Sequence, residues 1–360
     1  MNFFLITGLY RSGTTLLDKL LYQHPSLTVT SQPYPSFYHL VKKRFNEERN
    51  IQSVYPINTR LDNDYYEMQD FIRFLNHYKF NEGDQVSSGM DMILPSETGF
   101  IDSFKELQLR AGKELVKNAI EYTGSKEILC EDFIGVLLEN GVHVIHIVRD
   151  PRDVLCSVAL GKEYTGKTRP LLYTIRMWRK SVAFRIQYSE HPLFYSVRYE
   201  DLVKSPQAVL KELAGFMKIK EIELPSRLMD QQGNIWKSNS SFGGSELISS
   251  SSIGKYKEIL DSNIISYVNT LCAPELKYLD YECENIMEPK EVFDGFKEPF
   301  PIHHELFQHD YSVSEVNQNI EIKRAGLLKT DGHSLIEIEK YYQFESVYKI
   351  LKKACNLKLK

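Results

Sequence analysis

The sequence predicts an α/β protein of three layers, in which helices flank both faces of a central parallel β-sheet. One observation is that short apolar runs alternate with stretches of helical spacing along the 360 residues. This alternation is typical of βαβ units, whose strands lie parallel. A second observation is that polar loops with glycine or arginine directly follow two of the apolar runs. Because ligands bind at the carboxyl ends of parallel strands, we expect these loops to share one cleft.

Five segments are predicted as strands of this sheet. The strongest is 142–148, an apolar and β-branched run bounded by Gly141 and Arg149. The other four predicted strands are shorter and lie at 3–7, 27–30, 127–130 and 193–197. Helices are predicted at 14–23, from 153 to about 160, from 206 to about 217 and over much of 36–125.

The predicted domain organisation is a main domain over 1–285 and a partly helical extension over 286–360. The boundary is placed where the character of the sequence changes, shortly after Tyr281. The extension begins with a loop-like segment and ends in a lysine-rich amphipathic helix. The stretch 238–254 is rich in serine and glycine and is predicted to be a mobile loop.

Composition excludes several functional classes. The net charge of −4 is unlike the basic surface of a nucleic-acid-binding protein. The five cysteines are odd in number and form no CxxC pair, which favours a reducing compartment over a disulfide framework or a zinc site. No stretch approaches the roughly 18 apolar residues of a membrane span, and the apolar N-terminus is too short for a signal peptide. We therefore expect a cytoplasmic protein without an integral membrane segment.

The loop between the first predicted strand and helix has the features of a phosphate cradle. Gly13 lets the backbone approach an anion, and the helix that begins near Thr14 directs its amide donors and positive dipole end toward it. Thr15 adds a hydroxyl donor, and Arg11 adds a forked cationic donor. Gly8 and Gly13 have the spacing of a Walker loop, but Thr14 stands where that motif has lysine. A P-loop kinase is therefore disfavoured.

A second basic cluster follows the strongest predicted strand. Arg149 stands at its carboxyl end, where the cleft is expected, and Ser157 lies about one turn along the next helix. Asp153 is placed to cap or open that helix. Arg149 and Ser157 together suit a second phosphate, with charge-assisted hydrogen bonds from the arginine. The alternative is a surface cluster in which arginines and aspartates form ordinary ion pairs.

These two clusters together resemble the sulfotransferase superfamily, whose donor is 3′-phosphoadenosine 5′-phosphosulfate (PAPS). In that family a strand–loop–helix segment of the type Pro-x-Ser-Gly-Thr-Thr binds the 5′ phosphosulfate. An arginine, followed eight positions later by a serine, binds the 3′ phosphate. The matching residues here are 10–15, and Arg149 with Ser157. The sequence Arg-Ser-Gly-Thr-Thr-Leu-Leu, and later Arg-Asp-Pro-Arg-Asp-Val, resembles the corresponding segments of the bacterial and Golgi-type branches.

Downstream segments extend the resemblance to about residues 1–285. The segment 197–202 is similar to the family's Tyr-Glu-Asp-Leu segment, and 236–242 and 252–256 resemble its late nucleotide-binding loop. The resemblance implies a P-loop-like fold, PAPS as donor, adenosine 3′,5′-bisphosphate (PAP) as product and no metal. The nucleotide-binding residues that it implies are Arg11, Ser12, Gly13, Thr14, Thr15, Arg149, Ser157, Tyr199, Ser252 and Lys255.

The implied reaction is in-line transfer of a sulfuryl group to a hydroxyl or amine of a carbohydrate, lipid or small-molecule acceptor. Arg11 stands where relatives carry lysine or arginine beside the bridging oxygen, so we expect it to stabilise the leaving group. The general base is expected in the loop that follows 127–130, with Asp132 preferred and Glu131 second. His146 lies within a predicted strand and is interpreted as a core histidine.

Two alternatives remain open from the sequence. One is a nucleotide kinase or another P-loop phosphotransferase. The other is a catalytically degenerate member of the fold that binds nucleotide without turnover. The second alternative stays open because the usual general base is missing. Several relatives carry a glutamate after the second strand. Here Gln32 stands at that place, and an amide is not a useful proton acceptor.

Overall fold

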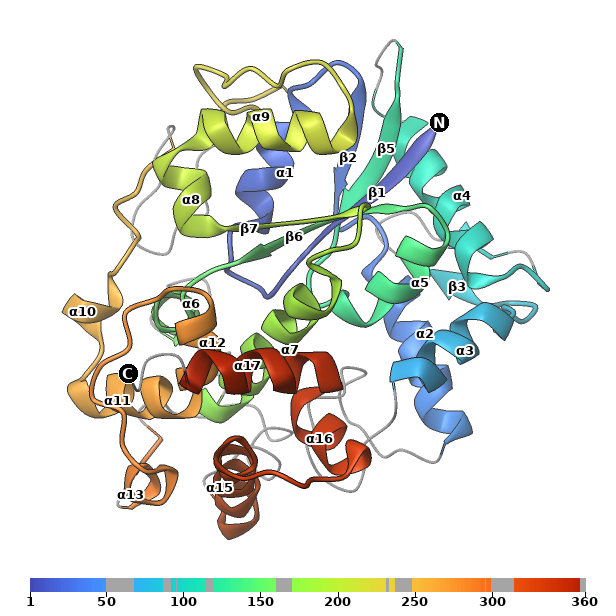
Figure 1. Ribbon diagram of the computed structural model, residues 1–360. Coiled ribbons are helices and arrows are strands. Elements are labelled where there is room, and N and C mark those ends of the chain that lie inside the picture. Colours follow the sequence, from blue (N-terminus) through green and yellow to red (C-terminus); the bar gives the residue numbers. More distant parts are fainter. Residues whose placement is uncertain are drawn as a thin grey trace.

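The first apolar run of the chain, β1 (Asn2–Thr7), forms the middle strand of a five-stranded sheet in the computed structural model (Figure 1). It pairs with β5 (Tyr122–Lys126) on one side and with β6 (His143–Val148) on the other. The edges are β2 (Leu27–Ser31) and β7 (Phe194–Arg198), so the order is β2-β5-β1-β6-β7. All four pairings are parallel, which confirms the predicted fold class.

The structure describes residues 1–49, 68–86, 92–94, 96–113, 115, 119–159, 170–230, 233–236, 248–294, 296–298 and 314–356. Most of the predicted mobile loop at 238–254, and Lys237 before it, lies outside these residues. Within them, no helix has the length and apolar composition that crossing a bilayer requires.

Side chains alternate between the two faces of each strand, so the sheet has apolar side chains on both faces. Helices cover both faces and bury these side chains. On one face Ile6 and Ile145 belong to a hydrophobic cluster with α1 (Thr14–Tyr22) and α9 (Pro206–Met217), next to α8 (Tyr199–Lys204). The opposite face is covered by α2 (Pro35–Glu48), α4 (Phe100–Lys113), α5 (Ile134–Glu139) and α7 (Leu171–Tyr188).

The remaining elements lie around this three-layer body. Two short strands form an antiparallel pair outside the main sheet. The remaining elements that precede the C-terminal segment are α3 (Met68–His77), β3 (Gln85–Val86), β4 (Met92–Ile93), the 3-10 helix η1 (Glu131–Phe133), α6 (Pro151–Ala159), α10 (Tyr256–Ile259), α11 (Ser262–Leu271) and α12 (Ala273–Tyr278).

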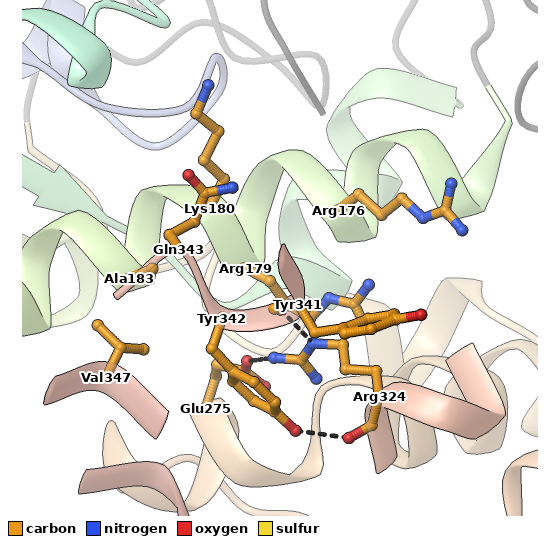
Figure 2. Close-up of a pocket in the computed structure, with 10 residues that line it drawn as sticks. All are labelled: Arg176, Arg179, Lys180, Ala183, Glu275, Arg324, Tyr341, Tyr342, Gln343 and Val347. Carbon is orange, nitrogen blue, oxygen red and sulfur yellow. Dashed lines mark hydrogen bonds and ion pairs between the residues drawn. The ribbon is translucent and has the colours of Figure 1, made fainter. Parts of the chain in front are cut away.

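The described part of the predicted C-terminal extension shares a hydrophobic cluster with the main domain. This segment contains α13 (Pro289–Phe293), α15 (Glu315–Lys329), α16 (Leu335–Tyr342) and α17 (Glu345–Asn356). Leu351 and Tyr342 belong to the same buried cluster as Trp178 of α7. Figure 2 shows side chains of α7, α12, α15 and α16 converging, with Arg324 directed at Glu275. The division at residue 285 stays a prediction.

Four of the five predicted strands agree with β1, β2, β6 and β7 to within one residue at each end. The predicted strand at 127–130 is wrong, because the strand lies five residues earlier, at β5. Its sequence, Tyr-Thr-Gly-Ser-Lys, is polar but wholly buried. Gly124 is required there, since a Cβ would lie 2.3 Å from the carbonyl oxygen of Phe4. Leu129 has a positive φ of 60°, so the apolar run after β5 forms a turn.

Candidate functional site

The loop between β1 and α1 lies against β6 and α8. Gly13 has a left-handed φ of 96° and immediately precedes α1. A Cβ at Gly13 would lie 2.4 Å from Cδ2 of Tyr199, so no other residue fits there without displacing the aromatic ring. α1 begins at Thr14, and the amides of its first turn have no carbonyl partner within the helix. The anion site that the sequence predicts would lie at these amides.

Arg11 joins this loop to the segment that follows β6. Its Nε donates a hydrogen bond to Oγ of Ser157 over 2.6 Å. Its carbonyl oxygen accepts a hydrogen bond of 3.2 Å from Arg149. The structure therefore brings together three of the predicted site residues, which are far apart in the sequence.

Arg149 and Tyr199 connect the first loop to the late loop. The buried guanidinium of Arg149 donates to the carbonyl oxygen of Ser252 over 2.7 Å and lies 4.5 Å from the ring centroid of Tyr199. The hydroxyl groups of Tyr199 and Ser252 are 2.8 Å apart. Tyr199 thus contacts Gly13, Arg149 and Ser252, which belong to three separate segments.

Two buried polar atoms in this cluster have no hydrogen-bond partner among the described residues. They are Nε of Arg149 and Oγ of Ser12. A buried donor without an acceptor costs free energy, and phosphate oxygens are strong acceptors for arginine. The residues therefore fit a ligand that carries phosphate groups.

The late loop, at residues 252–256, is held in place by hydrogen bonds to Asp153 of α6. Oδ2 of Asp153 accepts a hydrogen bond from the amide of Gly254 over 2.7 Å, and Oδ1 accepts one from the amide of Tyr256 over 3.0 Å. Asp153 is not the expected helix cap, because α6 begins earlier, at Pro151. Lys255 is partly exposed, and its Nζ lies 2.7 Å from Glu258. Its expected role in nucleotide binding stays a prediction.

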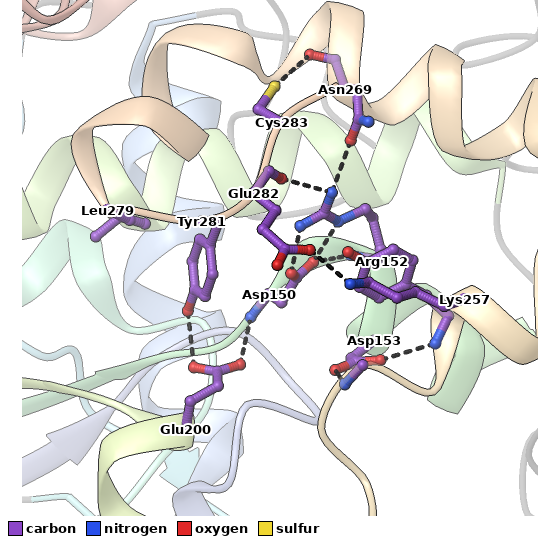
Figure 3. A network of polar contacts seen from close by, with 12 residues as sticks. Asp150, Arg152, Asp153, Glu200, Lys257, Asn269, Leu279, Tyr281, Glu282 and Cys283 are labelled. Atoms are coloured by element: carbon purple, nitrogen blue, oxygen red, sulfur yellow. Dashed lines mark hydrogen bonds and ion pairs between the residues drawn. The ribbon is translucent and has the colours of Figure 1, made fainter. Parts of the chain in front are cut away.

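The residues after Arg149 form a buried network and not a surface cluster (Figure 3). Arg152 makes two hydrogen bonds to the carboxylate of Asp150, at 2.9 and 2.6 Å, and its guanidinium lies 4.1 Å from the ring centroid of Tyr256. Glu200 accepts hydrogen bonds from the amide of Asp150 and the hydroxyl of Tyr281, over 3.0 and 2.8 Å. This network fixes the backbone that carries Arg149, so the alternative of a surface ion-pair cluster is wrong.

Asp132, the base expected from the sequence, is clamped by two buried ammonium groups. Nζ of Lys42 lies 2.5 Å from one carboxylate oxygen, and Nζ of Lys180 lies 2.6 Å from the other. Burial raises the pKa of Asp132, but Lys180 and Lys42 outweigh it and hold the pKa at about 2. A carboxylate with so low a pKa is a weak proton acceptor at neutral pH.

Glu131 and His146 belong to a neighbouring buried network. Burial raises the pKa of Glu131, and the nearby hydroxyl of Ser181 in α7 partly offsets this rise. The hydroxyl of Ser181 lies 2.9 Å from Nε2 of His146, and that of Ser196 lies 3.1 Å from its Nδ1. Burial lowers the pKa of His146 to about 3, so the imidazole is neutral. The interpretation of His146 as a core histidine is confirmed.

Glu127 is a site candidate that the sequence reasoning missed. It directly follows β5, and its amide donates to the carbonyl of Ile6 in β1 over 2.9 Å. It therefore lies at the carboxyl end of the sheet, beside the strand that leads into the first loop. The amide of Tyr34 donates to its carboxyl group over 3.4 Å, and burial raises its pKa to about 8. The signal that could have revealed it is its place as the first residue after a strand.

The chain folds as a three-layer α/β protein in which hydrogen-bond donors from separate segments converge near the loop between β1 and α1. The chain belongs to the sulfotransferase family, because the family model described as a sulfotransferase domain matches residues 2–280. It is therefore an enzyme of the sulfotransferase class, and the kinase alternative is wrong. A comparison with curated proteins finds no match.

Several solved sulfotransferases are similar to this chain. The sulfotransferase domain from the curacin biosynthetic pathway is 19% identical, with 78% of this chain and 99% of that chain covered and a TM-score of 0.45. A sulfotransferase from Alicyclobacillus acidocaldarius is 12% identical, with coverages of 78% and 94% and a TM-score of 0.42. Mouse sulfotransferase SULT7A1, complexed with PAP, is also 12% identical, with coverages of 89% and 88% and a TM-score of 0.37.

Proposed function

We propose that this protein transfers a sulfuryl group from PAPS to a hydroxyl or amine of a carbohydrate, lipid or small-molecule acceptor. The observation that supports PAPS is the chain of contacts from Arg11 through Ser157 and Arg149 to Ser252 and Tyr199. It joins the loop after β1, the segment after β6 and the late loop. A nucleotide with phosphate groups on both its 5′ and 3′ oxygens matches two separate anion-binding segments.

The residues divide between the two ends of the donor. Ser12, Gly13, Thr14 and Thr15 would hold the 5′ phosphosulfate, through the amides of the first turn of α1 and the threonine hydroxyls. The residues that would hold the 3′ phosphate are Arg149, Ser157, Tyr199, Ser252 and Lys255. PAPS supplies an activated sulfuryl group and a phosphate leaving group. We propose a reaction without metal, as the family resemblance implies.

Arg11 is the proposed catalytic cation. Arginine side chains carry a fixed positive charge, so Arg11 would stabilise negative charge on the leaving phosphate and would not act as a proton donor. Ser157 accepts the Nε hydrogen over 2.6 Å and so restricts the orientation of the guanidinium plane. A charge held in place before the reaction costs little reorganisation when charge develops.

We propose Glu127, and not Asp132 or Glu131, as the base that takes the acceptor proton. The ionised carboxylate of Asp132 is paired with the ammonium groups of Lys42 and Lys180, and Glu131 lies farther from the end of β5, in the 3-10 helix η1. Glu127 lies beside β1 at the carboxyl end of the sheet, and its pKa of about 8 is close to neutral pH. A general base works best when its pKa lies near the operating pH.

A cytoplasmic location is part of this proposal. All five cysteines lie among the described residues, and none of them forms a disulfide. Free thiols are typical of proteins in reducing compartments, so this observation supports the cytoplasm.

Transfer of label from PAPS tests the proposed function. Purified protein is incubated with sulfur-radiolabelled PAPS and separate panels of sugars, phenols, lipids and acyl-carrier substrates, and the products are separated by chromatography. We expect label on members of one panel, with release of PAP in equal amount. A parallel incubation with phosphorus-labelled ATP and Mg²⁺ should label nothing. Binding of PAPS without transfer to any panel would support the catalytically degenerate alternative instead.

A further inference from the structure

The carboxylate of Asp153 accepts hydrogen bonds from a loop that lies about one hundred residues later in the chain. Asp153 lies in the first turn of α6 and is only 1% exposed. Each carboxylate oxygen accepts one amide of the late loop, from Gly254 at 2.7 Å and from Tyr256 at 3.0 Å. Hydrogen bonds to an ionised acceptor are about twice as strong as neutral ones. This bidentate contact therefore holds the loop backbone firmly.

Ser252 lies two residues before Gly254, the first of the two anchored amides. Its carbonyl oxygen accepts from Arg149, and its hydroxyl bonds to Tyr199. At the other end of this segment, the ring of Tyr256 lies against Arg152, which the buried network of Figure 3 holds in place. Asp153 thus sets the position of Ser252 relative to the guanidinium that would meet the 3′ phosphate.

We propose that Asp153 is a positioning residue for nucleotide binding, which holds the loop 252–256 in place over the 3′ phosphate. This inference rests on the proposed function, because it requires a donor with a 3′ phosphate. A loop that is ordered before binding costs less conformational entropy when the ligand binds. The contribution of Asp153 is therefore specific to ligands that reach this loop.

Calorimetric titration of the Asp153→Asn variant tests the proposal, with PAP and adenosine 5′-phosphate as the two ligands. Asparagine keeps the shape of the side chain, but its amide nitrogen is a donor and faces one of the two loop amides. We expect the affinity for PAP to fall about tenfold, which corresponds to the loss of one hydrogen bond to a charged group. Adenosine 5′-phosphate lacks the 3′ phosphate, so its affinity should change much less.

Two further variants complete the test. Gly254→Ala strains a backbone with φ of 72° without a steric clash, and should reduce the preference for PAP in the same way. Asp201→Asn is the matched control, because Asp201 is 45% exposed and bonds to Arg198; the preference should not change. If wild-type protein does not prefer PAP, the proposed donor is wrong. If it does, but Asp153→Asn keeps that preference or weakens both ligands equally, the positioning role is wrong.

Discussion

Arg11→Ala is expected to reduce sulfuryl transfer about 1000-fold and to leave the fold intact. The side chain is the fixed positive charge of the loop between β1 and α1, held by Ser157 over 2.6 Å. Removing a single preorganised cation or donor at the reacting group typically costs about 100- to 1000-fold or more in turnover. The side chain is only partly buried, so its removal creates no large core cavity. Single-turnover transfer from PAPS measures the first effect, and thermal unfolding measures the second.

Two comparison variants define what this result means. Arg198→Ala removes an arginine at the carboxyl end of β7, which pairs with Asp201, and should retain transfer. Arg11→Lys keeps the positive charge but not the planar guanidinium. Its rate of sulfuryl transfer should lie between the rates of the wild type and Arg11→Ala. Turnover of Arg11→Ala at the wild-type rate would show that another group stabilises the leaving phosphate.

Glu127→Gln is expected to remove most of the transfer activity together with its pH dependence. A general base contributes about 100- to 10,000-fold, and glutamine has no basic oxygen at neutral pH. The pKa of Glu127 is about 8, so the carboxyl is protonated below that pH and accepts a proton only above it. For wild-type protein we expect kcat/KM to rise with pH through about 8. The variant should lack this rise and still bind PAP.

The neighbouring carboxylates provide the controls. Glu131→Gln should keep the rise in rate with pH. Asp132→Asn leaves the ammonium groups of Lys42 and Lys180 without their buried counter-ion, and breaking a buried pair costs about 3–5 kcal/mol of folding stability. It should therefore lower the unfolding temperature and not change the shape of the pH profile. If Glu127→Gln keeps that profile and Asp132→Asn or Glu131→Gln loses it, the base is one of the latter two.

The fold could be predicted wherever burial and apolar sequence coincide. β1 and β6 contain buried apolar runs, and the predicted strands agree with them to within one residue. β5 is buried but polar, because its side chains are satisfied by hydrogen bonds between elements. Oγ1 of Thr28 donates to that of Thr123 over 2.7 Å, and Gln108 donates to Ser125 over 3.0 Å. A pattern of hydrophobicity does not detect such a strand.

The same error hid the candidate base. A strand at 127–130 places Glu127 within the sheet and directs the prediction of the base to residues 131 and 132. The correct boundary at Lys126 places Glu127 first after the strand, at the edge where ligands bind. The position of this strand boundary therefore decides which carboxylate the sequence favours as the candidate base.

The candidate anion-binding loops could be proposed from the sequence because their chemistry is local. Glycine, hydroxyl and arginine residues at fixed spacing next to a strand already indicate an anion site. The roles of Asp132 and Asp153 could not be predicted, because their partners come from distant elements. Lys42 and Lys180 lie on α2 and α7, and Gly254 lies in the late loop. Only the folded chain brings these groups within hydrogen-bond distance.

Thermal unfolding with PAP, compared with ATP and Mg²⁺, tests the central claim most directly. A ligand that binds only the folded state stabilises it by about 2.7 kcal/mol when present at about 100 times its Kd. If the site around Arg11, Arg149 and Ser157 binds a nucleotide with a 3′ phosphate, PAP will raise Tm by several degrees and ATP with Mg²⁺ will not. A rise with ATP and Mg²⁺, and none with PAP, would contradict the account.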